Sequence, residues 1–326
     1  KLRASDLATY EAKTRKPVCR RYRGEIVCGH RPPTSGGVTV LQILGILQTV
    51  DPETLTASTA DLVHHVAEAS RLAFADRNRY LGDPAFVDIP LPRLVSDRYL
   101  IRRAASIRPD ASLGEAEPGL LKRRAALPEG PGGRTTTHYS IVDADGNAVS
   151  ITSSIEQAFG SHRMVRGFLL NNQLTDFSFQ PTVDGRPVAN RVQPGKRPMS
   201  SMAPTMVLDD EAELRMALGS PGGSRIITMN FLAVLDLLDG QSPSSVVANH
   251  RFHHQYQPDQ IQHEPETFTQ AEEERLRSLG HELKDVGRTY GNMQLVRQAK
   301  KTGQITGAAD PRGIGSTGVV DADDSE

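Results

Sequence analysis

The chain has 326 residues, a formal net charge of -1 at pH 7 and 37% hydrophobic residues. This length and apolar content suffice for a sizeable core, as one large or two ordinary domains. The near-neutral charge gives no electrostatic basis for binding nucleic acid or an anionic membrane, and no apolar run approaches the roughly 20 residues that span a bilayer. The chain starts with neither an initiator methionine nor a signal peptide, so we expect a fragment or a processed product.

The two cysteines, Cys19 and Cys28, flank a segment that is typical of two short strands around a turn at Gly24. A cross-strand disulfide would suit an oxidising compartment. Two partly buried free thiols are the alternative, and the spacing does not match a zinc site. We favour the disulfide, but the sequence leaves both states open.

Two helices are predicted in the first third of the chain. Gly36 and Gly37 allow close backbone approach, and the apolar run 38–47 that follows them predicts a buried helix. A longer helix opens at Thr59 or Asp61 and runs to Tyr80. His64 and His65 fall on it, and we interpret them as surface or boundary residues rather than metal ligands.

A linker and a hairpin follow. Residues 106–134 shift to proline, glycine and charge, which is typical of a solvated linker. Residues 137–142 and 148–154 alternate like strands around the turn signal Asp145-Gly146, so they predict a hairpin. If its loop is centred on Asp145, residues whose numbers sum to 290 face each other. Thr136 then lies opposite Ser154 and near Glu156.

Thr136 is a candidate nucleophile if the peptide bond between Thr135 and Thr136 is cut. It would then carry a hydroxyl and a free amine on one residue. An α-amino group titrates near about 7.8, so roughly one in seven is unprotonated at pH 7, against roughly one in 2,500 for a lysine. The amine is therefore the better base at neutral pH. The alternative is that a threonine-rich strand start reflects β-propensity alone.

A glycine-rich loop predicts a second element of the site. Residues 214–218 form a buried strand, 219–224 a loop and 225–238 a helix. The amides at such a junction point the same way and bind anions. Because the Walker A lysine is missing, we favour an oxyanion hole over a nucleotide phosphate. Residues 171–177, rich in amide and acid groups, indicate either a lined pocket or a turn with asparagine caps.

Several motifs resemble, in order and separation, those of the γ-glutamyltranspeptidases: Thr136–Ser140, Asp145–Asn147, Leu170–Gln173, Arg197–Met202, Gly219–Arg225 and Asp310–Arg312. The resemblance implies an α+β fold, the αββα sandwich of the N-terminal nucleophile hydrolases, incomplete here at its N-terminus. It also implies that a precursor cuts itself between Thr135 and Thr136. Residues 1–135, ending in a flexible linker over 106–135, would be the C-terminal part of the large subunit. Residues 136–326 would be the small subunit, and both would belong to one αββα domain.

The resemblance further implies the role of each site residue. Thr136 would attack the γ-amide carbonyl, and its catalytic partners would be the hydroxyl of Ser154, where the family usually has a threonine, and the amides of Gly222 and Gly223. The substrate α-carboxylate would be bound by Ser200 and Ser201, and the α-ammonium by Gln173, Asp176 and Glu156. Glu156 replaces the asparagine of many members, so a preference for γ-glutamyl over glutaryl compounds is expected unless its side chain points to solvent.

The function implied is that of a γ-glutamyltransferase and glutathione hydrolase without cofactor or metal. Its acyl-enzyme would be resolved by water or by an amino acid or dipeptide acceptor. The two subunits would stay associated, in the periplasm or outside the cell. Two alternatives remain: a related amidase for glutaryl-cephalosporins or poly-γ-glutamate, and an inactive truncated homologue. The second arises because the upstream half, which in the family supplies an arginine for the α-carboxylate, lies outside these residues.

Overall fold

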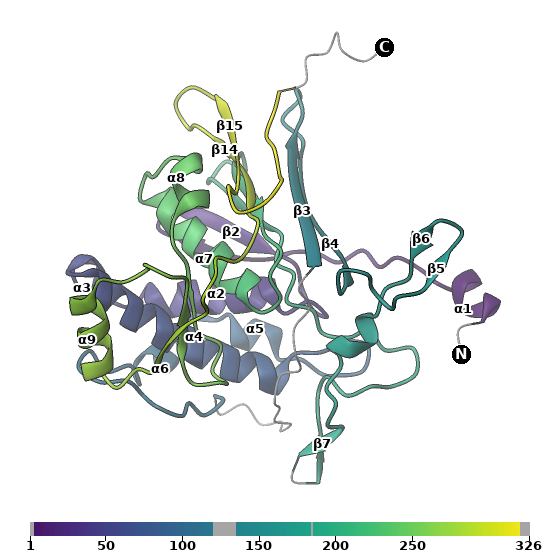
Figure 1. Cartoon of the computed structure of the whole chain (residues 1–326), viewed down its shortest axis with the longest axis horizontal. Coiled ribbons are helices and arrows are strands. Elements are labelled where there is room, and N and C mark those ends of the chain that lie inside the picture. The colour runs from purple at the N-terminus through teal and green to yellow at the C-terminus, as the bar shows by residue number, and fades with distance from the viewer. Residues whose placement is uncertain (1–2, 120–134, 184, 320–326) are drawn as a thin grey trace.

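The computed structural model describes residues 3–119, 135–183 and 185–319. Most of the helices gather on one side of a central sheet and a long hairpin stands on the other side, with the short N-terminal helix beyond it (Figure 1). The helices are α1 (Ala4–Ala8), α2 (Gly36–Leu47), α3 (Pro52–Thr56), α4 (Thr59–Tyr80), α5 (Leu91–Leu94), α6 (Asp97–Ala104), the 3-10 helix η1 (Gln173–Asp176), α7 (Arg225–Leu238), α8 (Pro243–Ala248) and α9 (Gln270–Ser278).

The strands form one large and several small sheets. The large sheet contains β1 (Val18–Tyr22), β2 (Glu25–Gly29), β9 (Thr205–Leu208), β10 (Leu214–Gly219), β14 (Gln294–Gln298) and β15 (Ile305–Ala309). The remaining strands are β3 (Thr135–Val142) with β4 (Ala148–Glu156), β5 (Met164–Val165) with β6 (Phe168–Leu169), β7 (Thr182–Val183) with β8 (Arg186–Pro187), and β11 (Phe252–His253), β12 (Ile261–His263) and β13 (Leu283–Asp285).

The large sheet joins the two halves of the chain. Its strands pair antiparallel in the order β1-β2-β9-β10-β14-β15. The ladder between β2 and β9, from Ile26 paired with Leu208 to Gly29 paired with Thr205, links residues before position 135 to residues after it. A cut between Thr135 and Thr136 would therefore leave both parts held by main-chain hydrogen bonds.

Helix α2 is the centre of the core, as its apolar run predicts. All of its residues are buried, and it contacts β1, β2, α4, α6 and α7. A Cβ atom on Gly36 would lie 2.5 Å from the Cβ of Ala203, a distance that real side chains do not reach. Glycine at this position therefore allows the start of α2 to lie directly against the backbone of residues 201–203.

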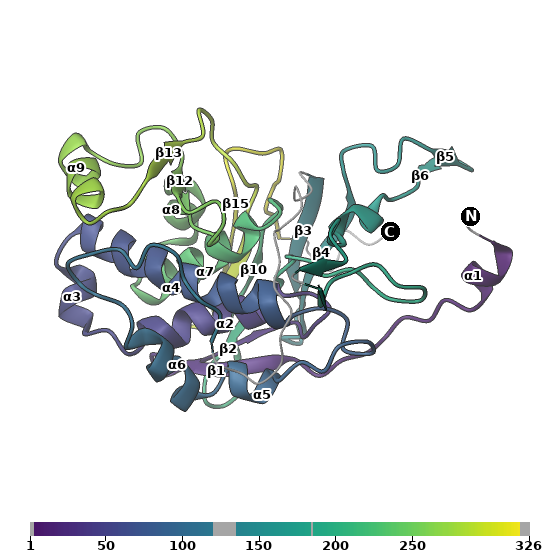
Figure 2. The same cartoon turned by 90° about the horizontal axis from the view of Figure 1, so that it is seen from below.

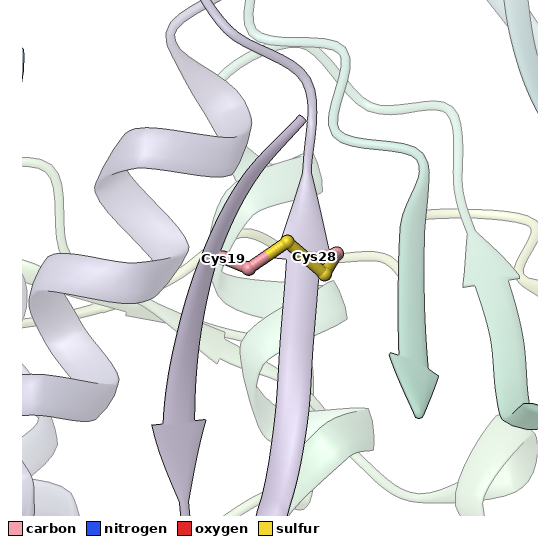
Figure 3. Close-up of a disulfide and its surroundings, with 2 residues drawn as sticks. All are labelled: Cys19 and Cys28. Carbon is pink, nitrogen blue, oxygen red and sulfur yellow. A yellow bond between two sulfur atoms is a disulfide. The ribbon is translucent and has the colours of Figure 1, made fainter. Parts of the chain in front are cut away.

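The predicted cysteine hairpin is present. Cys19 on β1 and Cys28 on β2 are register partners and are joined by a disulfide (Figure 3). Of the two states that the sequence leaves open, the structure therefore has the cross-linked one.

The segment predicted as a linker is only partly described. Within residues 106–119, the amide of Gly119 donates to Asp76 on α4 over 2.7 Å and that of Leu113 donates to Glu68 on the same helix over 3.0 Å. Ala116 is buried. Residues 113–119 are therefore held against α4, because buried acids on that helix supply hydrogen-bond acceptors that the linker composition did not reveal, whereas Ser106 and residues 108–110 are exposed. Residues 120–134 lie outside the described residues.

The layers follow from these contacts. Helices α2 and α7 cover one face of the large sheet, while β3 and β4 contact β10 and β14. Tyr139, Ile141, Val149 and Ile151 on the hairpin stay exposed, so no helix of the described residues covers that outer side (Figure 2). The described chain is thus a mixed α+β fold with a helix layer, a six-stranded sheet and a two-stranded sheet. None of the described helices is long and apolar enough to cross a membrane.

Candidate active site

The β3–β4 hairpin has the predicted register. Paired residues sum to 290 from Thr136 with Ser154 to Val142 with Ala148. Thr136 Oγ1 donates to Ser154 Oγ over 3.3 Å, and the amide of Glu156 donates to the same oxygen over 2.8 Å. The threonine hydroxyl and the serine hydroxyl therefore meet at the open end of the hairpin, as the alternation pattern predicted.

Glu156 turns inward at the end of β4. The register shifts between Thr135 and Thr136, so that Glu156 pairs with Thr135, and Glu156 itself has a positive φ of 76°. This bulge re-aims the side chain, which is only 3% exposed and accepts a hydrogen bond from Asn172 Nδ2. The carboxylate is therefore buried at the end of the hairpin that carries Thr136, and the alternative that it points to solvent is wrong.

The other two acid and amide candidates lie on η1. Gln173 Nε2 donates to Asp176 Oδ2 over 3.2 Å, and Asn190 Nδ2 donates to the backbone oxygen of Asp176 over 2.7 Å. Asn172 connects η1 to β4, because its Oδ1 accepts from the amide of Gln157 while its Nδ2 reaches Glu156. Asn172, which sequence reasoning did not single out, therefore links Glu156 at the end of β4 to the segment that carries Gln173 and Asp176.

The serine pair is fixed from the other half of the chain. Ser200 forms a parallel bridge with Thr34, and its backbone oxygen accepts from the amide of Ser35 over 2.7 Å. Ser201 Oγ accepts from Arg77 Nη2 over 2.7 Å. The stiff segment between Pro198 and Pro204 is therefore pinned to the loop before α2 and to α4.

The glycine loop lies at the same end of the hairpin as Thr136. Ser150, the register partner of Ser140, donates to the backbone oxygen of Leu218 over 3.3 Å. One residue further on, a Cβ on Gly219 would lie 2.3 Å from His138 Nδ1, so the imidazole packs on bare backbone there. The hairpin contacts Leu218 at the level of Ser140 and contacts Gly219 at the level of His138. The end of β10 that leads into the glycine loop therefore lies toward Thr136.

Gly222 and Gly223 lie in that loop with φ values of 145° and 62°. Both values belong to the region that only glycine adopts without strain. The loop leads into α7, whose first turn leaves amides without helical partners. Backbone donors therefore follow the end of β10, beside the hairpin, in the segment where the sequence predicts an oxyanion hole.

His138 lies two residues after Thr136 on β3, and both of its ring nitrogens contact hydroxyl groups. Its Nδ1 lies 2.8 Å from Thr152 Oγ1 and its Nε2 lies 3.1 Å from Ser140 Oγ. Burial lowers the pKa of His138 to about 4, so the ring is neutral at pH 7. Its role is to fill the space between the hairpin and β10 and to satisfy the hydroxyls on both strands.

This burial predicts a pH dependence of stability. An unfolded histidine titrates near about 6.5, so between pH 6.5 and 4 the unfolded chain binds a proton that the folded chain does not. The folded state therefore loses stability as the pH falls through this window, at up to about 1.4 kcal/mol per pH unit from His138. Chemical denaturation at several pH values should show a shallower slope in a His138→Asn variant. At pH 8, where the histidine is neutral in both states, the difference in unfolding free energy between wild type and variant measures the lost packing alone. Equal slopes of unfolding free energy against pH in the two proteins would contradict the prediction.

A separate cluster in the described part of the chain has the composition of a metal site. His64, Glu68 and His281 place possible ligand atoms within 4.8 Å of one another. Protein partners already engage them: His64 Nδ1 lies 2.7 Å from His281 Nε2, and His64 Nε2 lies 2.7 Å from the backbone oxygen of Arg108. The Glu68 carboxylate accepts from the amide of Leu113.

The cluster lies outside the candidate active site, because His281 follows α9, which is remote from β3 in both views (Figures 1 and 2). The prediction that His64 and His65 are surface or boundary residues is wrong, since both are buried. His64 is buried against His281, which is distant in sequence, and His65 bonds to the backbone oxygen of Asp61, so neither environment follows from the local pattern.

Known proteins resemble this chain in sequence and in fold. A family model described as gamma-glutamyltranspeptidase matches residues 1–320. The chain is 38% identical over 317 residues to a glutathione hydrolase proenzyme of Escherichia coli (strain K12), covering 95% of this chain and 53% of that protein. It is 34% identical over 308 residues to an acylase ACY 1 proenzyme of Pseudomonas sp. (strain SE83), covering 94% and 52%.

Among solved structures, the cephalosporin acylase from Bacillus halodurans superimposes with a TM-score of 0.81 at 26% identity, covering 95% of this chain and 54% of that one. The fold is therefore that of the N-terminal nucleophile hydrolases. Within this class, the chain belongs to the gamma-glutamyltranspeptidase family. It spans about half the length of the relatives that it matches.

Proposed function

We propose that this chain carries the nucleophile of a γ-glutamyltransferase and glutathione hydrolase. The observation that carries the proposal is the contact of Thr136 Oγ1 with Ser154 Oγ, 3.3 Å apart, at the end of the hairpin that faces the glycine loop. A threonine hydroxyl, a supporting hydroxyl and a run of backbone donors are the parts that amide cleavage through an acyl-enzyme needs.

Maturation would begin at the same residue. Attack of Thr136 Oγ1 on the carbonyl carbon of Thr135 breaks the peptide bond and forms an ester, with the proton passing to the released nitrogen. Water then hydrolyses the ester, which leaves a carboxylate on Thr135 and a free amine on Thr136. The ladder between β2 and β9 would keep the two products together.

Catalysis would use the new amine as the base. The amine accepts the proton of Thr136 Oγ1 as that oxygen attacks the γ-amide carbonyl, and the amides of Gly222 and Gly223 stabilise the oxyanion. The leaving amine takes the proton and departs. Water or the amino group of an amino acid or dipeptide then attacks the ester, which gives hydrolysis or transfer.

The substrate would be bound through both of its α-substituents. Glu156, Gln173 and Asp176 would hold the α-ammonium, and the hydroxyls of Ser200 and Ser201 would hold the α-carboxylate. The buried carboxylate of Glu156 supports this choice, because an anion taken from water is stabilised when a cation pairs with it. Glutathione and other γ-glutamyl compounds meet both requirements.

The second candidate function is that of an amidase for glutaryl-cephalosporins. It is favoured by the superposition on a cephalosporin acylase and by the identity with an acylase proenzyme. A glutaryl group, however, carries no α-ammonium that the buried Glu156 carboxylate could bind. Glu156 therefore favours the γ-glutamyl reading.

N-terminal sequencing tests the proposed processing. The purified chain should resolve into two bands on a denaturing gel, and the band with the residues after the cut should begin Thr136-Thr137-His138. The processed protein should release the anilide from a γ-glutamyl anilide. A chain that remains whole and inactive, also when the upstream region of its relatives is supplied, would reject the proposal in favour of an inactive homologue.

We further propose that the protein works in the periplasm or outside the cell. The cross-strand disulfide between Cys19 and Cys28 supports this location, because oxidising compartments preserve such bonds. Cell fractionation with thiol alkylation should place the protein there with both cysteines protected from the reagent. A cytosolic protein with two reactive thiols would contradict it.

A further inference from the structure

Arg77 on α4 joins the serine pair to the loop before α2. The side chain is buried, with 2% of its surface exposed. Its Nη2 donates to Ser201 Oγ over 2.7 Å, its Nε donates to Ser35 Oγ over 2.8 Å and its Nη1 donates to Asn78 Oδ1 over 2.9 Å. Ser35 Oγ in turn donates to the backbone oxygen of Ser200 over 2.7 Å. The Arg77 guanidinium thus contacts Ser201 directly and contacts Ser200 through the hydroxyl of Ser35.

The direction of these hydrogen bonds has a chemical consequence. A serine hydroxyl has one hydrogen to donate, and a guanidinium has only donors. Ser201 Oγ is therefore the acceptor from Arg77, and its own hydrogen points elsewhere. Ser200 Oγ is likewise an acceptor, from the amide of Met202 over 3.1 Å. Both hydroxyls are held so that their hydrogens remain available for an acceptor such as a carboxylate.

Arg77 also places a positive charge close to that acceptor, because only the Ser201 hydroxyl would lie between the guanidinium and the bound carboxylate. A hydrogen bond from a charged donor polarises the hydroxyl that accepts it, and the polarised hydroxyl becomes a stronger donor. The guanidinium lies in the buried interior, where screening by water is weak. A carboxylate bound by the serine pair would therefore be stabilised by Arg77 without touching it.

We propose that Arg77 is a positioning residue for the α-carboxylate of the substrate and acts through Ser201. The inference rests on the proposed function, in which Ser200 and Ser201 bind that carboxylate. It also means that the carboxylate subsite is assembled across the cleavage point. Arg77 and Ser35 come from the part before Thr136, and the serine pair comes from the part after it.

The test compares two anilide substrates in the full chain. γ-Glutamyl anilide carries the α-carboxylate, whereas 4-aminobutyryl anilide lacks it and keeps the amine. An Arg77→Gln variant is expected to lower kcat/KM for the first about tenfold or more, mainly by raising KM, and to leave the second unchanged. Arg77→Lys keeps the positive charge but loses the planar set of guanidinium donors, so its kcat/KM for γ-glutamyl anilide should lie between those of the wild type and Arg77→Gln. Arg79→Gln, two residues along the same helix, is the matched control and should change neither.

A double-mutant cycle with Ser201→Ala identifies the route. If Arg77 acts through Ser201, Arg77→Gln adds no further loss of discrimination in the Ser201→Ala background. Additive losses, or an equal fall for both substrates, would overturn the inference in favour of a structural role. If the Arg77→Gln chain is not processed, so that it gives one band on a gel, the double-mutant cycle is measured with Arg77→Lys instead, and its result decides whether Arg77 acts through Ser201. A wild-type enzyme that does not discriminate between the two anilides would instead reject the serine pair as the carboxylate site, and with it the proposed function.

Discussion

A Thr136→Ala variant is expected to remain a single polypeptide on a denaturing gel and to lose at least about a thousandfold of its γ-glutamyl activity. The reason is that one hydroxyl serves both steps. In the proposed mechanism it breaks the bond to Thr135, and it then carries the acyl group. Ser154 cannot replace it, because Ser154 lies within β4 and has no amine of its own to release. Gel analysis and anilide turnover of wild type and variant measure both effects.

Two further variants control this experiment. Thr137 is the next residue of β3 and is exposed, so Thr137→Ala should process and turn over as the wild type does. Thr136→Ser keeps a primary hydroxyl and should process, with reduced activity. If Thr136→Ala still gives two bands and turns over substrate, the nucleophile lies elsewhere and the proposed mechanism is wrong.

A Glu156→Gln variant is expected to lower kcat/KM for γ-glutamyl anilide by about tenfold to a hundredfold and to narrow its preference over glutaryl anilide. The wild-type carboxylate is buried at the end of β4, where, in the proposed binding mode, it pairs with the ammonium of the substrate. The glutaryl compound has no such group. Glutamine has nearly the same shape and can still bond to Asn172, so the variant removes mainly the charge.

Steady-state kinetics on both anilides measure this preference. Glu156→Asn introduces the residue of many family members and should give an intermediate preference. Turnover of the two anilides at equal rates by the wild type would sink the assignment of Glu156 to the ammonium subsite. It would favour the glutaryl amidase as the function.

Features that depend on residues close together in the sequence were predictable, whereas features that depend on contacts between distant residues were not. The hairpin register, α2, α4, α7 and the glycine loop rest on local alternation, apolar periodicity and turn chemistry, and the structure confirms them. The inward turn of Glu156 depends on a bulge that alternation alone does not encode. The packing of residues 113–119 depends on acids buried on α4.

The contacts of Arg77 with Ser35 and Ser201 lie beyond any local pattern, because they join residues 42 and 124 positions apart. The position of β9 also lies beyond any local pattern. This strand has only four residues, and in the large sheet it lies between β2, from the part before Thr136, and β10, from the part after it. The motif resemblance located the serine pair and the glycine loop. It did not show what orients them, since orientation comes from tertiary packing.

The exposed apolar side of the β3–β4 hairpin has a consequence for the dynamics of the nucleophile. A two-stranded sheet is marginally stable alone, and among the described strands this one gains its support from β10 and β14. The element that carries Thr136 can therefore open locally at a lower free energy than the large sheet behind it. Any surface that covers Tyr139, Ile141, Val149 and Ile151 would tighten the strand and, with it, the alignment of the catalytic hydroxyl.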